Sequence, residues 1–199
     1  MKLLLGTTNS GKISDYIKYL QDARIEIVTL KDLGLITDEP LEIGETYRDN
    51  ALLKARFYAE AAEYPTLADD GGFEAEALDG RPGIESKRWV GLHGTDQDRI
   101  DKVMKAMQVQ KNRNAKLVLT VCIYLPAERE AIFVENAIEG IIPEQASQKV
   151  AAGFPYRSVL FLPKYNKFYI DLSEEEHEEI NHRRIACKEL LLKLEPYLN

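Results

Sequence analysis

The sequence predicts an α/β fold with a mixed β-sheet, and two observations carry this prediction. The chain opens with an apolar run, a loop of small residues, a helical pattern and a second alternating run, which is the order of a βαβ unit. Two longer strand-like runs follow later, at residues 117–125 and 131–142. The 199 residues contain no internal repeat, low-complexity tract or linker, so we expect a single domain over residues 1–199.

Each element of the opening βαβ unit is predicted by a pattern of its own. Residues 3–5 form a short apolar strand, and residues 6–11 form a loop of Gly, Thr, Asn and Ser. From Lys12 the apolar residues recur at helical spacing, and residues 25–30 alternate like a second strand. The loop would therefore lie at the carboxyl end of the first strand.

The other elements follow from the same patterns and from turn and cap signals. In chain order we expect a helix at 46–62, a strand at 65–68, a weaker strand at 73–78, a turn at 79–83, a helix at 96–107 capped by Thr95, the strands at 117–125 and 131–142, a strand at 159–162, and one long helix at 174–197.

The charge balance restricts the partners of the protein. There are 33 acidic and 26 basic residues, a formal net charge of −7, and non-specific binding to nucleic acids or anionic membranes needs a basic face instead. No apolar run approaches the roughly 18 residues of a membrane helix, and the N-terminal run is too short for a signal peptide. We expect a soluble, cytoplasmic protein with no nucleic-acid or membrane partner; an anionic small molecule is compatible if a divalent metal assists.

The two cysteines, Cys122 and Cys187, have no metal-ligand spacing and lie in apolar patterns. They indicate reduced core thiols, not a zinc site or a disulfide.

The first candidate site is the loop from Thr7 to Lys12. Backbone N–H groups at a helix N-terminus can bind phosphate, and Lys12 could contact a phosphate oxygen. The spacing is not that of a P-loop. A tight turn with a solvated lysine is the alternative interpretation.

The second candidate is the start of the helix at residues 46–62. Asn50 and Lys54 are four residues apart and share a face, which could line a cleft together with Glu42 and Glu45. The alternative is a capped helix and nothing more, because Thr46 and an acid three residues later form a capping signature.

The third candidate is the pair Asp69 and Asp70, which we place at the end of a strand and before Gly71 and Gly72. Mg²⁺ prefers one or two carboxylates together with waters and substrate phosphates, so this pair suits it. An Asp/Gly turn is the alternative.

Two later clusters are weaker. Phe154 and Tyr156 could stack a base or simply pack in the core, and a lone histidine such as His182 is more often structural.

Taken in this order and spacing, the clusters resemble the inosine triphosphate pyrophosphatase family over nearly the whole chain. The motif T-x-N-x-x-K is met by Thr7, Asn9 and Lys12. The motif E-x-G-x-[ST]-[FY]-x-[ED]-N-A-x-x-K-A is met over residues 42–55. The most specific match runs over residues 68–88, from Ala-Asp-Asp to Ser-Lys-Arg.

The resemblance implies Mg²⁺-dependent hydrolysis of ITP, dITP and XTP to the monophosphate and pyrophosphate, which cleanses the nucleotide pool. It implies an elongated fold of two lobes around a central cleft, and a homodimer. Glu42 and Asp70 would hold Mg²⁺, and Asp70 or Asp69 would be the catalytic base. The substrate would be bound by Thr7, Thr8, Asn9, Ser10, Gly11, Lys12, Lys54, Gly71, Phe154, Pro155, Tyr156, Arg157, His177, His182 and Arg183.

The chain departs from the family pattern mainly where the base would be read. Arg157 replaces an aspartate, His177 replaces a lysine, and Gly71 replaces a serine near the phosphates. A site that reads a base by hydrogen bonds discriminates by leaving polar groups unpaired for the wrong base. Three hypotheses follow: the usual inosine and xanthosine preference, the same chemistry on a different nucleotide, or a nucleotide-binding protein with little turnover.

Overall fold

The structure is a computed structural model that describes residues 1–35, 40–91 and 93–198. The chain divides into two compact units. Unit 1 comprises Met1–Asp70, Leu119–Asn136 and His182–Asn199, and unit 2 comprises Gly71–Val118 and Ala137–Asn181. The strands of the described residues form an eight-stranded sheet in the order β2-β1-β3-β5-β6-β7-β8, with β4 paired to β3.

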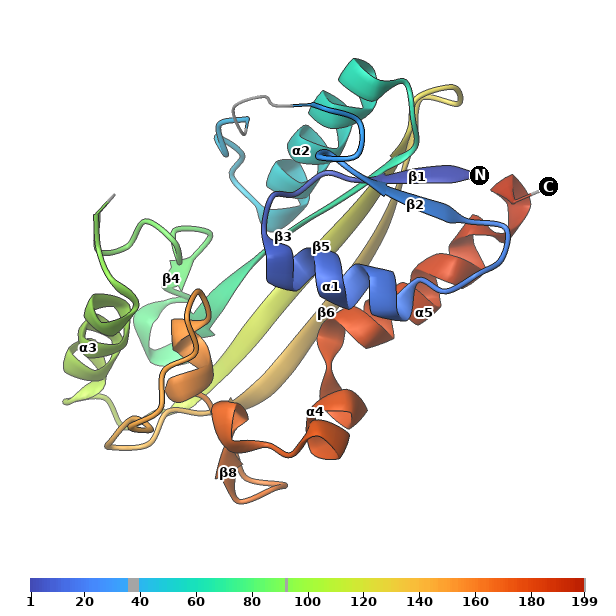
Figure 1. The fold of residues 1–199 in the computed structure, drawn as a ribbon. Coiled ribbons are helices and arrows are strands. Elements are labelled where there is room, and N and C mark those ends of the chain that lie inside the picture. The colour runs from blue at the N-terminus through green and yellow to red at the C-terminus, as the bar shows by residue number, and fades with distance from the viewer. Residues whose placement is uncertain (36–39, 92, 199) are drawn as a thin grey trace. The chain divides into compact units, whose positions relative to one another are not determined.

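Unit 1 begins with the expected βαβ arrangement (Figure 1). Strand β1 (Lys2–Leu5) pairs in parallel with β2 (Glu26–Thr29) on one side and with the first part of β3 (Thr66–Ala75) on the other. The adjoining parts of β5 (Asn114–Leu125) and β6 (Glu130–Ile141) also belong to this unit.

Helices cover both faces of the sheet in unit 1. Helices α1 (Ser10–Tyr19) and α5 (His182–Leu194) lie side by side on one face, and α2 (Tyr47–Ala62) packs on the other (Figure 1). Because strand side chains alternate between faces, Leu3 and Leu5 pack with α1 and α5, whereas Leu4 packs with α2. A 3₁₀ turn at Glu195–Tyr197 follows α5.

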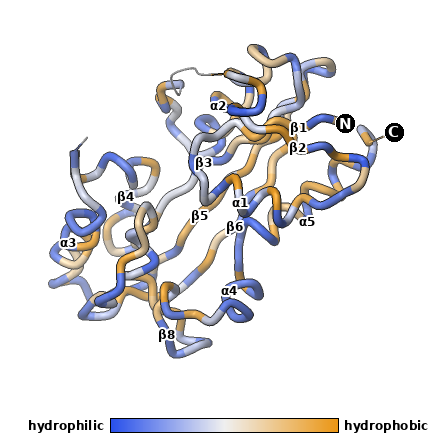
Figure 2. The backbone as a smooth tube through the Cα atoms, viewed as in Figure 1, coloured by the Kyte–Doolittle hydropathy of each residue, from blue (hydrophilic) through white to orange (hydrophobic). Residues whose placement is uncertain are grey.

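Unit 2 has its own core, in which Phe73, Val103, Met107 and Ile138 are buried. It contains the second part of β3 and these further elements: β4 (Pro82–Gly83), α3 (Asp96–Met107), β7 (Phe161–Leu162), β8 (Lys167–Phe168), α4 (Glu174–Ile180) and 3₁₀ turns at Glu76–Leu78, Pro155–Ser158 and Tyr169–Asp171. Helix α4 is mostly hydrophilic (Figure 2).

The helix starts agree with the cap signals in the sequence. Thr46 and Thr95 precede α2 and α3, and each forms a reciprocal capping box with the aspartate three residues later. The bounds of α3 are those expected from its periodicity. No helix in the described part of the chain has both the length and the apolar composition needed to cross a bilayer.

The prediction for the Asp-Asp-Gly-Gly segment was wrong in one respect. Strand β3 does not end before Asp69 but runs on to Ala75, and a 3₁₀ turn replaces the rest of the weaker strand expected at 73–78. Turn propensity was overridden because Asp69 and Asp70 are neutralised by basic side chains in the folded protein.

Two predictions in the last third of the chain were also wrong. The strand expected at 159–162 is limited to Phe161–Leu162, because a 3₁₀ turn precedes it. The long C-terminal helix is broken at the buried Asn181, whose ψ of 110° is not helical. Asparagine favours such breaks because its side chain competes for backbone hydrogen bonds.

Candidate active site

The site in unit 1 is organised around two adjacent residues of β3. Asp69 and Asp70 are both buried, with exposed fractions of 2% and 8%. Since neighbouring side chains of a strand point to opposite faces, Asp69 lies on the side of α1 and α5, whereas Asp70 lies on the side of α2. The two carboxylates therefore have different partners.

Asp69 is held by one cation on each oxygen. Lys12 Nζ donates to Oδ1 at 2.6 Å, and Arg183 donates from Nε and Nη2 to Oδ2 at 3.3 Å. Arg183 also lies 3.5 Å from Asp15 of α1. Lys12 and Arg183 come from the first turns of α1 and α5, so the packing of these two helices builds the cage around Asp69.

The electrostatics of this cage keep Asp69 ionised. Burial by itself would raise the pKa of Asp69, but the charges of Lys12 and Arg183 hold that pKa well below its usual range. The buried Tyr16 lies in the same environment, where burial first and the negative charge of Asp69 second raise the pKa of its hydroxyl well above the usual value. Asp69 is thus a fixed anion that is poorly suited to accept a proton.

Asp70 is bound more loosely. Its Oδ2 accepts a hydrogen bond from Asn50 Nδ2 at 3.1 Å, and its Oδ1 lies 3.4 Å from Lys54 Nζ. The same ammonium group lies 2.7 Å from Glu42 Oε1. One lysine is therefore shared by two carboxylates.

This sharing changes the protonation behaviour of all three groups. Burial, together with the nearby charge of Glu42, raises the pKa of Asp70 in spite of Lys54. Burial would lower the pKa of Lys54, but Asp70, Asp69 and Glu42 outweigh it, so that this pKa is raised. Asp70 is accordingly a stronger base than an ordinary aspartate, and Lys54 stays protonated.

Asn50 ties the loop that carries Glu42 to the carboxylate of Asp70. Its Oδ1 accepts a hydrogen bond from the backbone N–H of Gly44 at 2.8 Å, while its Nδ2 donates to Asp70. A Cβ atom at Gly44 would lie 2.6 Å from Asp49 Cβ and 2.8 Å from Asn50 Oδ1. Only glycine allows the loop to approach the start of α2 this closely.

The residues present fit a magnesium ion. Glu42 and Asp70 both lie beside the ammonium group of Lys54, and Mg²⁺ takes one or two carboxylates with the remaining ligands from water and phosphate. The described residues contain no cluster of three or more His, Cys, Asp or Glu side chains that could hold a metal. Glu42 and Asp70 are the two carboxylates that would hold the ion.

The loop before α1 has the geometry of an anion-binding helix start. Asn9 caps the helix, since its Oδ1 accepts from the N–H of Lys12 at 3.1 Å, and Thr7 Oγ1 accepts from the N–H of Asn9 at 3.2 Å. Thr8 and Ser10 are exposed and Gly11 is half-buried. The first-turn N–H groups of Ser10 and Gly11 have no carbonyl partner within the helix, which suits them to phosphate.

A second group of predicted site residues lies in unit 2. The Arg157 guanidinium lies over the rings of Phe154 and Tyr169, with its carbon 4.3 and 5.2 Å from their centroids. His177 of α4 stacks on Tyr169, and its Nε2 lies 3.0 Å from the Tyr169 hydroxyl. Two of the three positions that depart from the family pattern, Arg157 and His177, thus meet at one tyrosine.

Other predicted residues have structural surroundings. Tyr156 stacks on Phe73 with ring centroids 4.9 Å apart, and its hydroxyl donates to the carbonyl of Ser86 at 2.6 Å. Pro155 is buried beside it, Gly71 is an exposed residue of β3, and His182 is buried at the start of α5.

The comparisons with known proteins decide the family. Residues 3–193 match the Ham1 family. The chain belongs to the Ham1 family. This confirms the family resemblance that the motifs indicated, and the mixed α/β sheet flanked by helices is confirmed as well.

Relatives within the Ham1 family match over nearly their whole length. A dITP/XTP pyrophosphatase of Halalkalibacterium halodurans is 34% identical over 94% of this chain and 95% of that protein. One of Wigglesworthia glossinidia brevipalpis is 36% identical over 98% and 99%. Among solved structures, the Ham1 protein of Staphylococcus aureus has 29% identity and a TM-score of 0.86, covering 99% of this chain and 100% of that chain.

Three residues near these groups were missed in the sequence of this Ham1-family chain. Asp15 and Tyr16 lie three and four residues after Lys12, and this helical spacing is a signal that could have placed them beside it. Tyr169 has no such signal, because Arg157 and His177 lie in other elements, 12 residues before it and 8 residues after it.

Proposed function

We propose that this Ham1-family protein is a Mg²⁺-dependent nucleoside triphosphate pyrophosphatase that hydrolyses non-standard purine nucleotides, namely ITP, dITP and XTP, to the monophosphate and pyrophosphate. Relatives with 34–36% identity carry the name dITP/XTP pyrophosphatase. The observation that carries the proposal is the difference between two adjacent carboxylates of β3. Asp69 is paired with two cations, whereas Asp70 shares Lys54 with Glu42.

Asp70 is the proposed catalytic base. Its place on the side of α2, with Asn50 fixing the orientation of the carboxylate, suits it to accept a proton from the attacking water. Asp69, with both oxygens occupied by cations, instead positions Lys12 and Arg183. This assigns the base role to Asp70 and not to Asp69.

Lys12, Lys54 and the loop before α1 are the proposed phosphate contacts. The triphosphate would be bound by the first-turn N–H groups of α1 and by side chains of the loop, and the two ammonium groups would stabilise the leaving pyrophosphate. When bound by Glu42 and Asp70, Mg²⁺ would neutralise phosphate charge and lower the pKa of nearby water.

The remaining assignments are proposals that rest on the family pattern. Substrate contacts are proposed at Phe154, Pro155, Tyr156, Arg157 and His177 of unit 2, at His182 and Arg183 of unit 1, and at Gly71. We also propose a homodimer that acts in the cytoplasm without a nucleic-acid or membrane partner.

The test is a substrate panel. The purified protein is incubated with Mg²⁺ and ITP, dITP, XTP, GTP, ATP, CTP or UTP, and pyrophosphate and orthophosphate are measured separately. Pyrophosphate chiefly from ITP, dITP and XTP is the expected result. Pyrophosphate release chiefly from another nucleotide would contradict the proposed substrates. No pyrophosphate release, with nucleotide binding intact, would identify the chain as a nucleotide-binding protein.

A further inference from the structure

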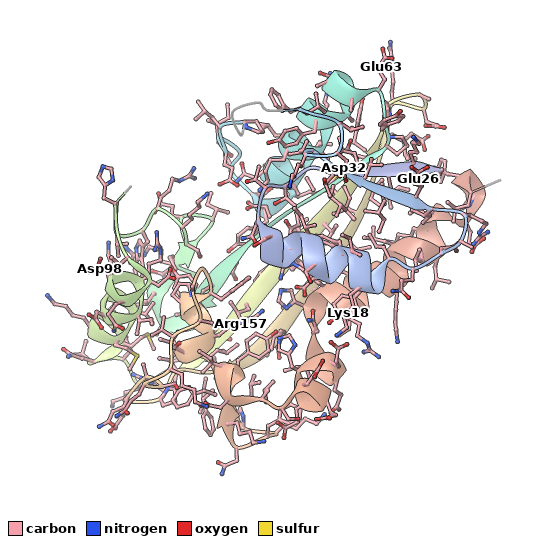
Figure 3. The ribbon with its side chains drawn as sticks, in the orientation of Figure 1. Lys18, Glu26, Asp32, Glu63, Asp98 and Arg157 are labelled. Atoms are coloured by element: carbon pink, nitrogen blue, oxygen red, sulfur yellow. The ribbon has the colours of Figure 1, made fainter. Side chains whose placement is uncertain are left out.

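Tyr16 places a hydroxyl group inside unit 1 to which the proposed function gives no role. Its side chain is fully buried, whereas Lys18, two residues later, is exposed on the opposite side of α1 (Figure 3). Lys12, four residues before Tyr16, shares the face of Tyr16 on the helix. Among the described residues, the Tyr16 hydroxyl completes no hydrogen bond. A buried hydroxyl in this state costs free energy and calls for an explanation.

The carboxylate of Asp69 explains the position of this hydroxyl. Burial first and the negative charge of Asp69 second raise the pKa of Tyr16 well above its usual value, so the hydroxyl keeps its proton. Lys12 donates to Oδ1 of Asp69 at 2.6 Å, and Arg183 donates to Oδ2 at 3.3 Å. The two cations hold the carboxylate, and the Tyr16 hydroxyl lies beside it as a further donor that is not engaged.

The two cations differ in how firmly they are held beside Asp69. Arg183 is buried and lies 3.5 Å from a second acid, Asp15. Lys12 is half-buried and belongs to the first turn of α1, where the phosphates are proposed to bind. If its ammonium group moved to a phosphate oxygen, Oδ1 of a buried carboxylate would lose its donor. Leaving a buried charged group unsatisfied costs more than leaving a neutral one.

We infer that Tyr16 is a positioning residue that donates a hydrogen bond to Asp69 when Lys12 leaves this carboxylate for a substrate phosphate. The proton stays on the tyrosine oxygen, Asp69 stays anionic, and Arg183 keeps its partner. The exchange of donors is a property of unit 1 alone. It rests on the proposed function only for the identity of the group that draws Lys12 away.

A double-mutant cycle tests the exchange without any ligand. Urea unfolding is measured for the wild type, Tyr16→Phe, Lys12→Met and the double variant. In the wild-type background Tyr16→Phe should change the unfolding equilibrium constant by less than threefold, because the hydroxyl is not engaged. With Lys12→Met it should raise the constant by about 10-fold to 100-fold, since a hydrogen bond to a charged group contributes about 1.5–3 kcal/mol.

Tyr58→Phe is the matched control for this cycle. It also removes a buried hydroxyl, but from α2, which packs on the other face of the sheet. Its effect on the unfolding equilibrium constant should be the same in both backgrounds. An equal effect of Tyr16→Phe in the two backgrounds would overturn the inference, because a merely structural tyrosine does not respond to the loss of Lys12.

A binding measurement tests the part that involves phosphate and decides alone if Lys12→Met does not fold. The affinity for inorganic tripolyphosphate is measured by calorimetry without metal for the wild type, Tyr16→Phe and Tyr58→Phe. The affinity should fall at least fivefold in Tyr16→Phe and stay within twofold in Tyr58→Phe. Equal affinities, or no binding by the wild type, would overturn the inference. If both expected results were obtained but no triphosphate released pyrophosphate, only the proposed function would be contradicted.

Discussion

Asp69 and Asp70 differ by one position in the chain, yet their surroundings favour opposite protonation behaviour. Asp69 has a depressed pKa because two cations outweigh its burial, and Asp70 has a raised pKa because burial and Glu42 outweigh Lys54. Substitution of each residue should therefore have a different principal effect.

We expect Asp70→Asn to lower kcat by at least about 100-fold, the typical contribution of a general base, with little loss of stability. We expect Asp69→Asn to lower the free energy of unfolding by about 3–5 kcal/mol, because it removes the buried carboxylate that pairs with both Lys12 and Arg183. Urea unfolding and pyrophosphate release measured on both variants check this. A stable but inactive Asp69→Asn protein, with an active Asp70→Asn protein, would reverse the assignment.

Acid should destabilise the protein partly through Asp69. Its folded-state pKa lies below the unfolded value of about 4, so its contribution is fully present above that pH and is lost as the pH falls further. Asp70, with its raised pKa, acts in the opposite direction. Urea unfolding at pH 5, 4 and 3 should show a steeper loss of stability for the wild type than for Asp69→Asn. Parallel pH profiles would contradict the depressed pKa.

At the scale of elements, the loop before α2 is held against the helix by one close backbone contact. Gly44→Ala should displace this loop, because the added Cβ meets Asp49 and Asn50 at less than 3.0 Å. Since the loop carries Glu42, we expect a higher Mg²⁺ requirement and at least about tenfold lower kcat/KM, in the range of losses for groups that support metal ligands. Ile43→Ala, at a position that is 77% exposed, is the control. Equal Mg²⁺ dependence of the two variants would exclude this role.

The cysteines lie inside two elements of unit 1, β5 and α5. Both are free, fully buried thiols, and burial raises the pKa of each to about 12. Neither should react with a thiol reagent at pH 8 in the native protein, whereas both should react in denaturant, because the thiolate is the reactive form. Rapid labelling of one thiol without denaturant would show that its element opens locally.

The sequence predicted those elements and site residues whose signals are local. Helix α3 was predictable because Thr95 and Asp98 form a capping box before a periodic stretch. The continuation of β3 through Asp69 was not, because the cations that neutralise it come from α1 and α5. Likewise, Arg157 was noticed as a departure from the family, but its contact with Tyr169 depends on tertiary structure.

At the scale of the whole molecule, the chain passes between the two units four times. Three passages lie within strands, after Asp70, Val118 and Asn136, and the fourth is the helix break after Asn181. Asp69 and Asp70 directly precede the first passage, and His182 and Arg183 directly follow the last one.

The alternation of β3 has a consequence for how the sequence of this segment can vary. A deletion of one residue between Thr66 and Asp69 that kept the pairing of β3 with β1 would exchange the faces of the two acids, so that Asp70 would take the place of Asp69 on the side of α1 and α5. A deletion of two residues would preserve the faces but shift the acids along the strand. The two aspartates have identical side chains. Which face of β3 each one occupies therefore depends on whether an odd or an even number of residues separates it from the first paired residue of the strand.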